Sequence, residues 1–218
     1  MSAIATLVFE LLANPARFIE QGRSYALLQE YFGGEPIDSL RPLLAHEDAN
    51  VQRAATFVAS ELGVAAAPLV RDVAPLLLSS DPHVLYQTMD VLMVCAIGRD
   101  ASEFVHLVRM MTSSHAFLRR RAMFLVGNAA RDQLVAAMGR LESHVADDRV
   151  HLEGLTALGR AEQLSATELL EWIRGDCPLL RRYGVLAVEK AHERSPSLLL
   201  AAQECDDPDV REFAKRLV

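Results

Sequence analysis

The chain has 218 residues, of which 51% are hydrophobic and 23% are charged, so it has ample apolar material for a folded core. This composition excludes collagen-like and intrinsically disordered chains. The formal net charge of −7 also disfavours nucleic acid as a partner, because affinity for nucleic acid comes largely from neutralising phosphates.

Residues 1–35 predict two or three helices, because their apolar residues recur at helical spacing and Gly33 and Gly34 end the last of them. The predicted helices are Ala3–Leu12, Pro15–Gln21 and Tyr25–Phe32. The first apolar run lacks the basic region of a signal peptide, and no apolar stretch reaches the ~20 residues that span a bilayer. We interpret this segment as an irregular helical cap on one end of a repeat array.

A repeat begins after this cap. Its anchor residues are spaced by 33 residues three times and then by 30 residues twice: Val51, Val84, Phe117, Val150, Leu180 and Val210. Before each anchor lies a turn or cap signal, in most copies containing Asp, Ser or Pro, as expected where a helix begins. Small residues occupy the fourth position after the anchor in four copies, where they allow a neighbouring helix to approach closely: Ala55, Gly154, Gly184 and Ala214.

A shorter helix is predicted before each anchored helix. These shorter helices are Asp38–Leu44, Ala67–Leu78, Ser102–Met111, Arg131–Leu141, Ala166–Ile173 and Pro196–Gln203. A single pair cannot bury its apolar face, whereas stacked pairs can. The sequence therefore predicts an all-α solenoid of about six antiparallel helix pairs over residues 36–218. We expect these pairs and the cap to form a single domain.

Three segments resemble the second helix of HEAT-like repeats of the PBS-lyase type. They are DANVQRAATFVASELG (48–63), DPHVLYQTMDVLMVCA (81–96) and DPDVREFAKRLV (207–218). The resemblance covers residues 36–218 and implies an armadillo-like superhelix whose second helices line its concave surface. It implies an architecture and says little about function. The copy at 114–129, which contains HAFLRRRAMFLVGN, departs from the pattern.

Charge is distributed unevenly along the repeats. Residues 114–140 carry five arginines and one aspartate, a net charge of +4, and residues 141–180 carry three basic and eight acidic residues, a net charge of −5. Arg119, Arg120 and Arg121 fan around a helix, so they cannot all be buried. They form either a binding patch for a carboxylate-rich partner or phosphate, or a solvated face that pairs with acidic neighbours.

A partner-binding surface is predicted on the outward face of the anchored helices. Arg, Tyr, Phe and Met recur there, a mixture that is enriched in protein interfaces. The predicted partner-binding residues are Arg53, Phe57, Tyr86, Asp90, Arg119, Arg120, Met123 and Arg182. The alternative is that this face is displaced by one position and that these side chains belong to the core.

No catalytic motif is visible, so we predict no enzyme, no cofactor and no metal site. The chain has no phosphate loop, GxSxG or HExxH motif. Its seven histidines are scattered, and a helix break at Asp147 and Asp148 is predicted to separate His144 from His151, whereas a metal needs three or four convergent ligands. Cys177 at a helix start has no nearby base and is expected to be a structural thiol.

We therefore predict a protein-binding scaffold. Residues 27–63 are similar to small acidic bacterial immunity proteins, which implies a cytoplasmic protein that neutralises a basic toxin partner. An odd number of cysteines without framework spacing also favours the cytoplasm. The alternatives are a HEAT-like DNA-repair protein of the glycosylase type, which would need a basic groove, and a tetrapyrrole lyase. The oligomeric state is left open.

Overall fold

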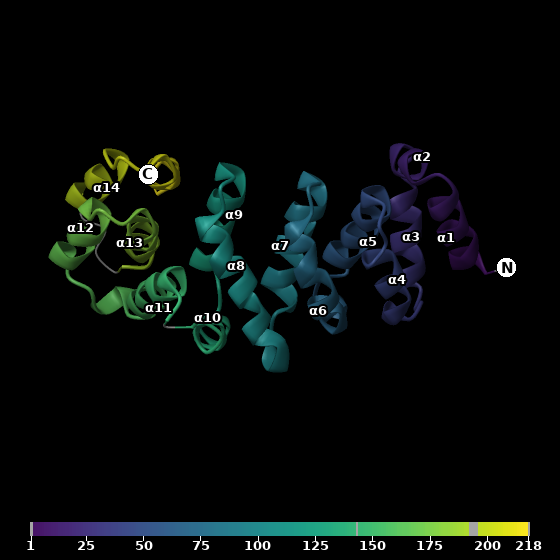
Figure 1. The fold of residues 1–218 in the computed structure, drawn as a ribbon, viewed down its shortest axis with the longest axis horizontal. Helices are drawn as coiled ribbons and strands as arrows, with labels where there is room; N and C mark the ends of the chain where they lie inside the picture. The colour runs from purple at the N-terminus through teal and green to yellow at the C-terminus, as the bar shows by residue number, and fades with distance from the viewer. Residues whose placement is uncertain (1, 143, 192–195, 218) are drawn as a thin grey trace. The chain divides into compact units, whose positions relative to one another are not determined.

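The computed structural model of this chain describes residues 2–142, 144–191 and 196–217 (Figure 1). These residues form fifteen α-helices and six short 3-10 helices and contain no strand, which confirms the predicted all-α class. When adjoining 3-10 segments are counted with the α-helices, the predicted helices begin and end within four residues of the observed ones. Within the described ranges no helix is long and apolar enough to cross a membrane.

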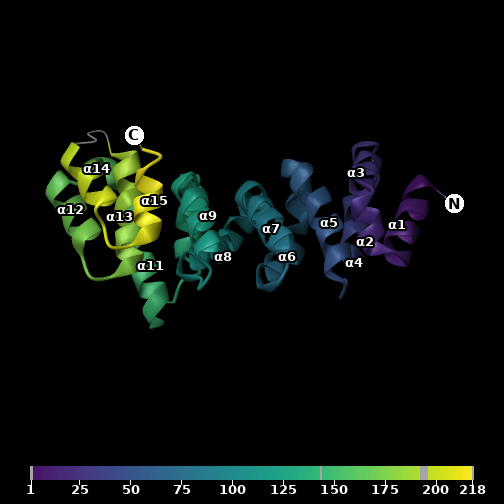
Figure 2. The same ribbon diagram turned by 90° about the horizontal axis from the view of Figure 1, so that it is seen from above.

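The first of two compact units is Met1–Glu103. Its helices are α1 (Ala3–Ala13), α2 (Pro15–Glu20), α3 (Arg23–Phe32), α4 (Arg41–Leu44), α5 (Ala49–Glu61), α6 (Val70–Val73) and α7 (Pro82–Cys95). In both views these helices follow one another in chain order, from purple to blue (Figures 1 and 2). Helix α3 packs between α1 and α5, and α5 packs on α7. The two anchored helices of this unit, α5 and α7, therefore share a buried face.

Short 3-10 segments replace much of the shorter helix in each pair of this unit. They are η1 (Ile37–Leu40), η2 (Gly63–Leu69), η3 (Ala74–Leu78) and η4 (Gly98–Phe104), the last of which ends at the first residue of the second unit. Prolines explain the first three interruptions, because proline lacks the backbone N–H that a continuous α-helix requires. Pro42 lies in the first turn of α4, Pro68 lies inside η2 and Pro75 lies in the first turn of η3.

The second compact unit is Phe104–Val218. Its helices are α8 (Val105–Arg109), η5 (Met110–Thr112), α9 (Ala116–Gly127), α10 (Arg131–Met138), α11 (Ala146–Leu158), η6 (Ala161–Gln163), α12 (Ala166–Arg174), α13 (Pro178–Lys190), α14 (Pro196–Gln203) and α15 (Pro208–Ala214). Helix α13 packs against α9, α11, α12, α14 and α15. Residues 183–188 are buried without interruption, so α13 has no solvent-facing side over this stretch. That the two units continue one solenoid stays a prediction.

Two glycines allow the close helix approach expected at the fourth position after the anchor. A Cβ atom added to Gly154 of α11 would lie 2.0 Å from the Tyr183 ring of α13. A Cβ atom added to Gly184 would lie 3.1 Å from the Cβ of Trp172 on α12. The missing side chain at Gly154 therefore leaves the space that the fully buried Tyr183 fills.

We expect Gly154→Ala to lower the free energy of unfolding by about 2–3 kcal/mol, because its methyl group would overlap the Tyr183 ring. Gly159→Ala is the matched control, since its added methyl group meets nothing nearer than 3.4 Å and should change stability by less than about 0.5 kcal/mol. Urea titration followed by circular dichroism measures both effects. Equal effects would show that the contact with Tyr183 does not set the spacing of α11 and α13.

Candidate partner-binding surfaces

The arginine run on α9 is joined to the last helix of the chain by ion pairs. The Nε atoms of Arg119 and Arg120 donate to the two carboxylate oxygens of Asp209 on α15, at 2.6 and 2.8 Å. The Asp209 side chain is fully buried. Burial opposes its ionisation, but the hydrogen bonds from Arg120 and Arg119 outweigh burial, and the pKa of Asp209 lies below its usual value.

A third arginine extends this cluster to α13. The Nε atom of Arg182 donates to Asp207 at 3.0 Å, and its Nη1 atom donates to the Met111 carbonyl at 2.6 Å. Asp207 is the N-cap residue of α15, where it also accepts from the Asp209 backbone N–H. We call Arg119, Arg120, Arg182, Asp207 and Asp209 the arginine–aspartate cluster. It ties α9, α13 and α15 together.

The same brace occurs at equivalent repeat positions in the first unit. Arg53 lies two residues after its anchor and donates through Nε to Asp81, the N-cap residue of the next anchored helix, at 3.2 Å. Arg182 and Asp207 occupy the corresponding positions of their own copies. Arg119 occupies this position too, but it donates to Asp209 and not to Asp147, the residue that the repeat would supply.

These contacts sort the predicted partner-binding residues into two groups. Met123 is fully buried in the core, so its assignment to a partner surface was wrong by the displacement considered above. Arg53, Arg119, Arg120 and Arg182 each form an ion pair within the chain. Tyr86 remains 39% exposed, whereas Phe57 and Asp90 are partly exposed. These last three lie on the packed helices α5 and α7.

A buried polar pair sits where α11 meets α13. The Nδ1 atom of His151 lies 2.8 Å from the Tyr183 hydroxyl, and its Nε2 atom has no hydrogen-bond partner among the described residues. Burial lowers the pKa of His151 to about 4, although the nearby Asp148 and Asp147 oppose that shift. Asp148 itself is held ionised by Arg109 of α8, whose Nη2 atom lies 2.6 Å from its carboxylate. Asp147 and Asp148 lie in the first turn of α11, which begins at Ala146, so the helix break predicted at these two residues was wrong and the helix begins just before them.

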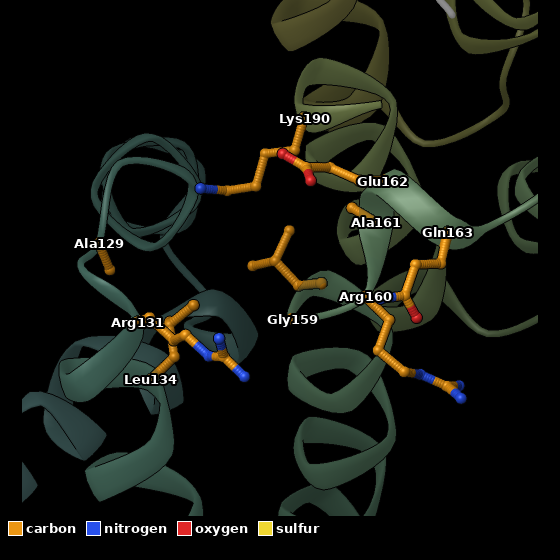
Figure 3. A pocket seen from close by; sticks show the side chains of 10 residues that line it. Ala129, Arg131, Leu134, Gly159, Arg160, Ala161, Glu162, Gln163 and Lys190 are labelled. Carbon is orange, nitrogen blue, oxygen red and sulfur yellow. The ribbon is translucent and has the colours of Figure 1, made fainter. Parts of the chain in front are cut away.

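A hollow of about 490 Å³ lies within the second unit (Figure 3). It is bordered by the start of α10, by the end of α11 with η6, and by the end of α13. Its lining residues are Ala129, Arg131, Leu134, Leu158, Gly159, Arg160, Ala161, Glu162, Gln163 and Lys190. Sequence reasoning missed this site, because its residues lie at helix ends and do not form a recognisable motif.

The described residues contain no set of side chains suited to a metal ion. Within the described ranges, no three His, Cys, Asp or Glu side chains are grouped so that they could hold an ion. Cys177 is the N-cap residue of α13, as predicted. His192 lies outside the described residues.

The fold and its packing define an all-α protein of packed helix pairs. No family model and no curated protein matches the chain. It is similar to two crystal structures of engineered proteins, one at 16% identity with a TM-score of 0.42 and one at 15% identity with a TM-score of 0.43. The first covers 83% of this chain and 94% of the engineered chain, and the second covers 84% and 97%. Similarity this distant supports no functional argument.

We expect Asp209→Asn to lower the free energy of unfolding by about 3 kcal/mol or more, because the guanidinium groups around it would lose their buried counter-ion. Glu212→Gln on the same helix is the control, since its partly exposed carboxylate pairs with Lys215 and interacts with Arg120 only at longer range. It should leave the unfolding curve unchanged. Thermal and urea unfolding of both variants give the comparison, and an Asp209→Asn protein as stable as wild type would contradict a bracing role.

Stability should also fall as pH drops from about 6.5 to about 4, because the unfolded chain binds a proton at His151 that the folded chain excludes. The full contribution of this histidine over that window is about 3 kcal/mol. We expect His151→Gln to flatten the dependence of unfolding free energy on pH between 6.5 and 5. His115→Gln, at an exposed position, should retain the wild-type slope. If both variants keep that slope, His151 is not the titrating group.

Proposed function

We propose that this chain is a protein-binding scaffold of HEAT-like helix pairs that binds a basic partner protein through the first unit, Met1–Glu103. The observation that carries the proposal is the distribution of charge between the two units. Residues 1–103 hold 6 of the 22 basic and 13 of the 29 acidic residues, a net charge of −7, and residues 104–218 hold 16 of each. The whole net charge of the protein therefore belongs to the first unit.

Ion pairing within the first unit leaves several of its carboxylates available. Its arginines pair with acidic neighbours at five of six positions: Arg23, Arg41, Arg53, Arg71 and Arg99. Five glutamates form no ion pair within the described residues: Glu20, Glu30, Glu35, Glu47 and Glu61. Surplus carboxylates of this kind steer a basic partner toward the surface and help to exclude acidic ones.

Aromatic side chains on the same unit provide the apolar contacts that an interface needs. Phe9, Tyr25, Phe32 and Tyr86 are between 39% and 67% exposed. Aromatic residues are enriched in protein interfaces because they bury a large area at a low cost in conformational entropy. Together with the unpaired glutamates, they favour a protein partner over a small polar ligand.

We further propose a toxin domain as the partner and the cytoplasm as the site of action. This step depends on the similarity of residues 27–63 to bacterial immunity proteins. These residues lie entirely within the acidic first unit. An immunity protein needs no catalytic group, only a surface that covers its toxin. Duplex DNA fits less well, because Arg53, Arg119, Arg120 and Arg182 already donate to carboxylates of this chain.

The test is affinity capture from an extract of the native host, with the chain immobilised and bound proteins identified by mass spectrometry. We expect wild type to retain a basic protein at about 50 mM salt and to release it near 0.5 M, because salt screens exposed charges. A variant with Glu30→Lys, Glu47→Lys and Glu61→Lys should lose this protein through like-charge repulsion.

The matched control carries Glu153→Lys, Glu171→Lys and Glu204→Lys in the second unit, at exposed positions. It makes the same change in net charge, so it should still bind the partner if the partner contacts the first unit. Equal loss from both triple variants would overturn the assignment to the first unit. Tyr86→Ala separately tests the surface of α5 and α7 on which Phe57, Tyr86 and Asp90 lie. We expect this substitution to weaken partner binding roughly tenfold.

A further inference from the structure

Positively charged side chains outnumber negatively charged ones in the lining of the hollow in the second unit. Three cationic residues line it, namely Arg131, Arg160 and Lys190, against the single carboxylate of Glu162. Within the described part of the chain, none of the three cations forms an ion pair. Arg109, Arg119 and Arg182 of the same unit are each paired with an aspartate, so this hollow differs from the arginine–aspartate cluster.

The lining combines these cations with an apolar floor. Ala129, Leu134, Leu158 and Ala161 are each less than 10% exposed. In Figure 3, Arg131 and Lys190 extend over the hollow from opposite sides, whereas Arg160 turns outward along its rim beside Gln163. A volume of about 490 Å³ lies within the range of ligand sites, and an apolar floor with a few polar groups is their usual construction.

We propose that this hollow binds a small organic phosphate. The planar guanidinium of Arg131 suits bidentate contact with the oxygens of a phosphate group, and Lys190 lines the same hollow. Arg131 is also the first residue of α10, so the partial positive charge of that helix end lies at the same edge. The apolar floor suits an apolar or aromatic body on the ligand, which a bare ion lacks. This inference is independent of the proposed partner protein.

The experiment is calorimetric titration of the full chain with three probes: adenosine 5′-monophosphate, inorganic phosphate and adenosine. We expect the nucleotide to bind with a Kd on the order of 1 mM or tighter. Inorganic phosphate should bind roughly tenfold more weakly because it cannot cover the apolar floor, and adenosine should not bind measurably because it lacks the charge. Phosphate that binds as tightly as the nucleotide would overturn the organic part of the proposal.

Two variants locate the site. Arg131→Gln and Lys190→Gln should each weaken nucleotide binding roughly tenfold, the effect of losing one charge-assisted hydrogen bond. Arg140→Gln is the matched control, since it removes an exposed arginine of the same basic segment that does not line the hollow. Circular dichroism tests whether each variant is folded. If Arg131→Gln does not fold, Lys190→Gln still gives an independent result. Nucleotide binding that is absent at about 10 mM, or equal in all three variants, would overturn the proposal.

Discussion

The ion pairs of Asp209 are the constraint on which the second unit depends. They link residues that are 89 and 90 positions apart, and the carboxylate that makes them is fully buried. A buried carboxylate is stable only while cations pair with it. Separating α15 from α9 would therefore break the ion pairs of Asp209 and leave buried charges without partners. The short α15 therefore closes the unit through electrostatics as well as through its apolar face, where Val210 and Phe213 are buried.

This arrangement explains why the most conspicuous motif of the sequence was ambiguous. Three consecutive arginines on a helix cannot all be buried, and that geometric argument holds: Arg119 is largely covered, and Arg120 keeps 43% of its side chain exposed. What the sequence could not supply was the partner. The 33-residue period identifies Asp147 as the equivalent acceptor, whereas the chain uses Asp209. Periodicity assigns equivalent positions, but only the packing of α9 on α13 and α15 decides which copies meet.

Local signals gave the helices reliably, because caps, prolines and apolar spacing act over a few residues. Asp48, Asp81 and Asp207 are N-cap residues where the turn signals were seen, and their side chains accept from backbone N–H groups. The close helix approach at Gly154 was predicted from the small size of the residue alone. In the structure the Tyr183 ring fills the space that the missing side chain leaves. The face of a helix was less certain, since one position of displacement rotates a side chain by about 100°. Met123 shows this: it was predicted to face a partner, but its side chain is buried in the core.

The two units differ in net charge, which is −7 in residues 1–103 and zero in residues 104–218. This difference bears on the proposed function more than the repeat does. The second unit has equal numbers of acidic and basic residues and pairs several of them internally, and within the described residues Arg131 and Lys190 stay outside those ion pairs. The first unit also commits most of its arginines, but it has more than twice as many carboxylates, so the excess stays at its surface. Self-repulsion of that excess disfavours the compact state, and a cost of this kind is offset when a basic surface covers it.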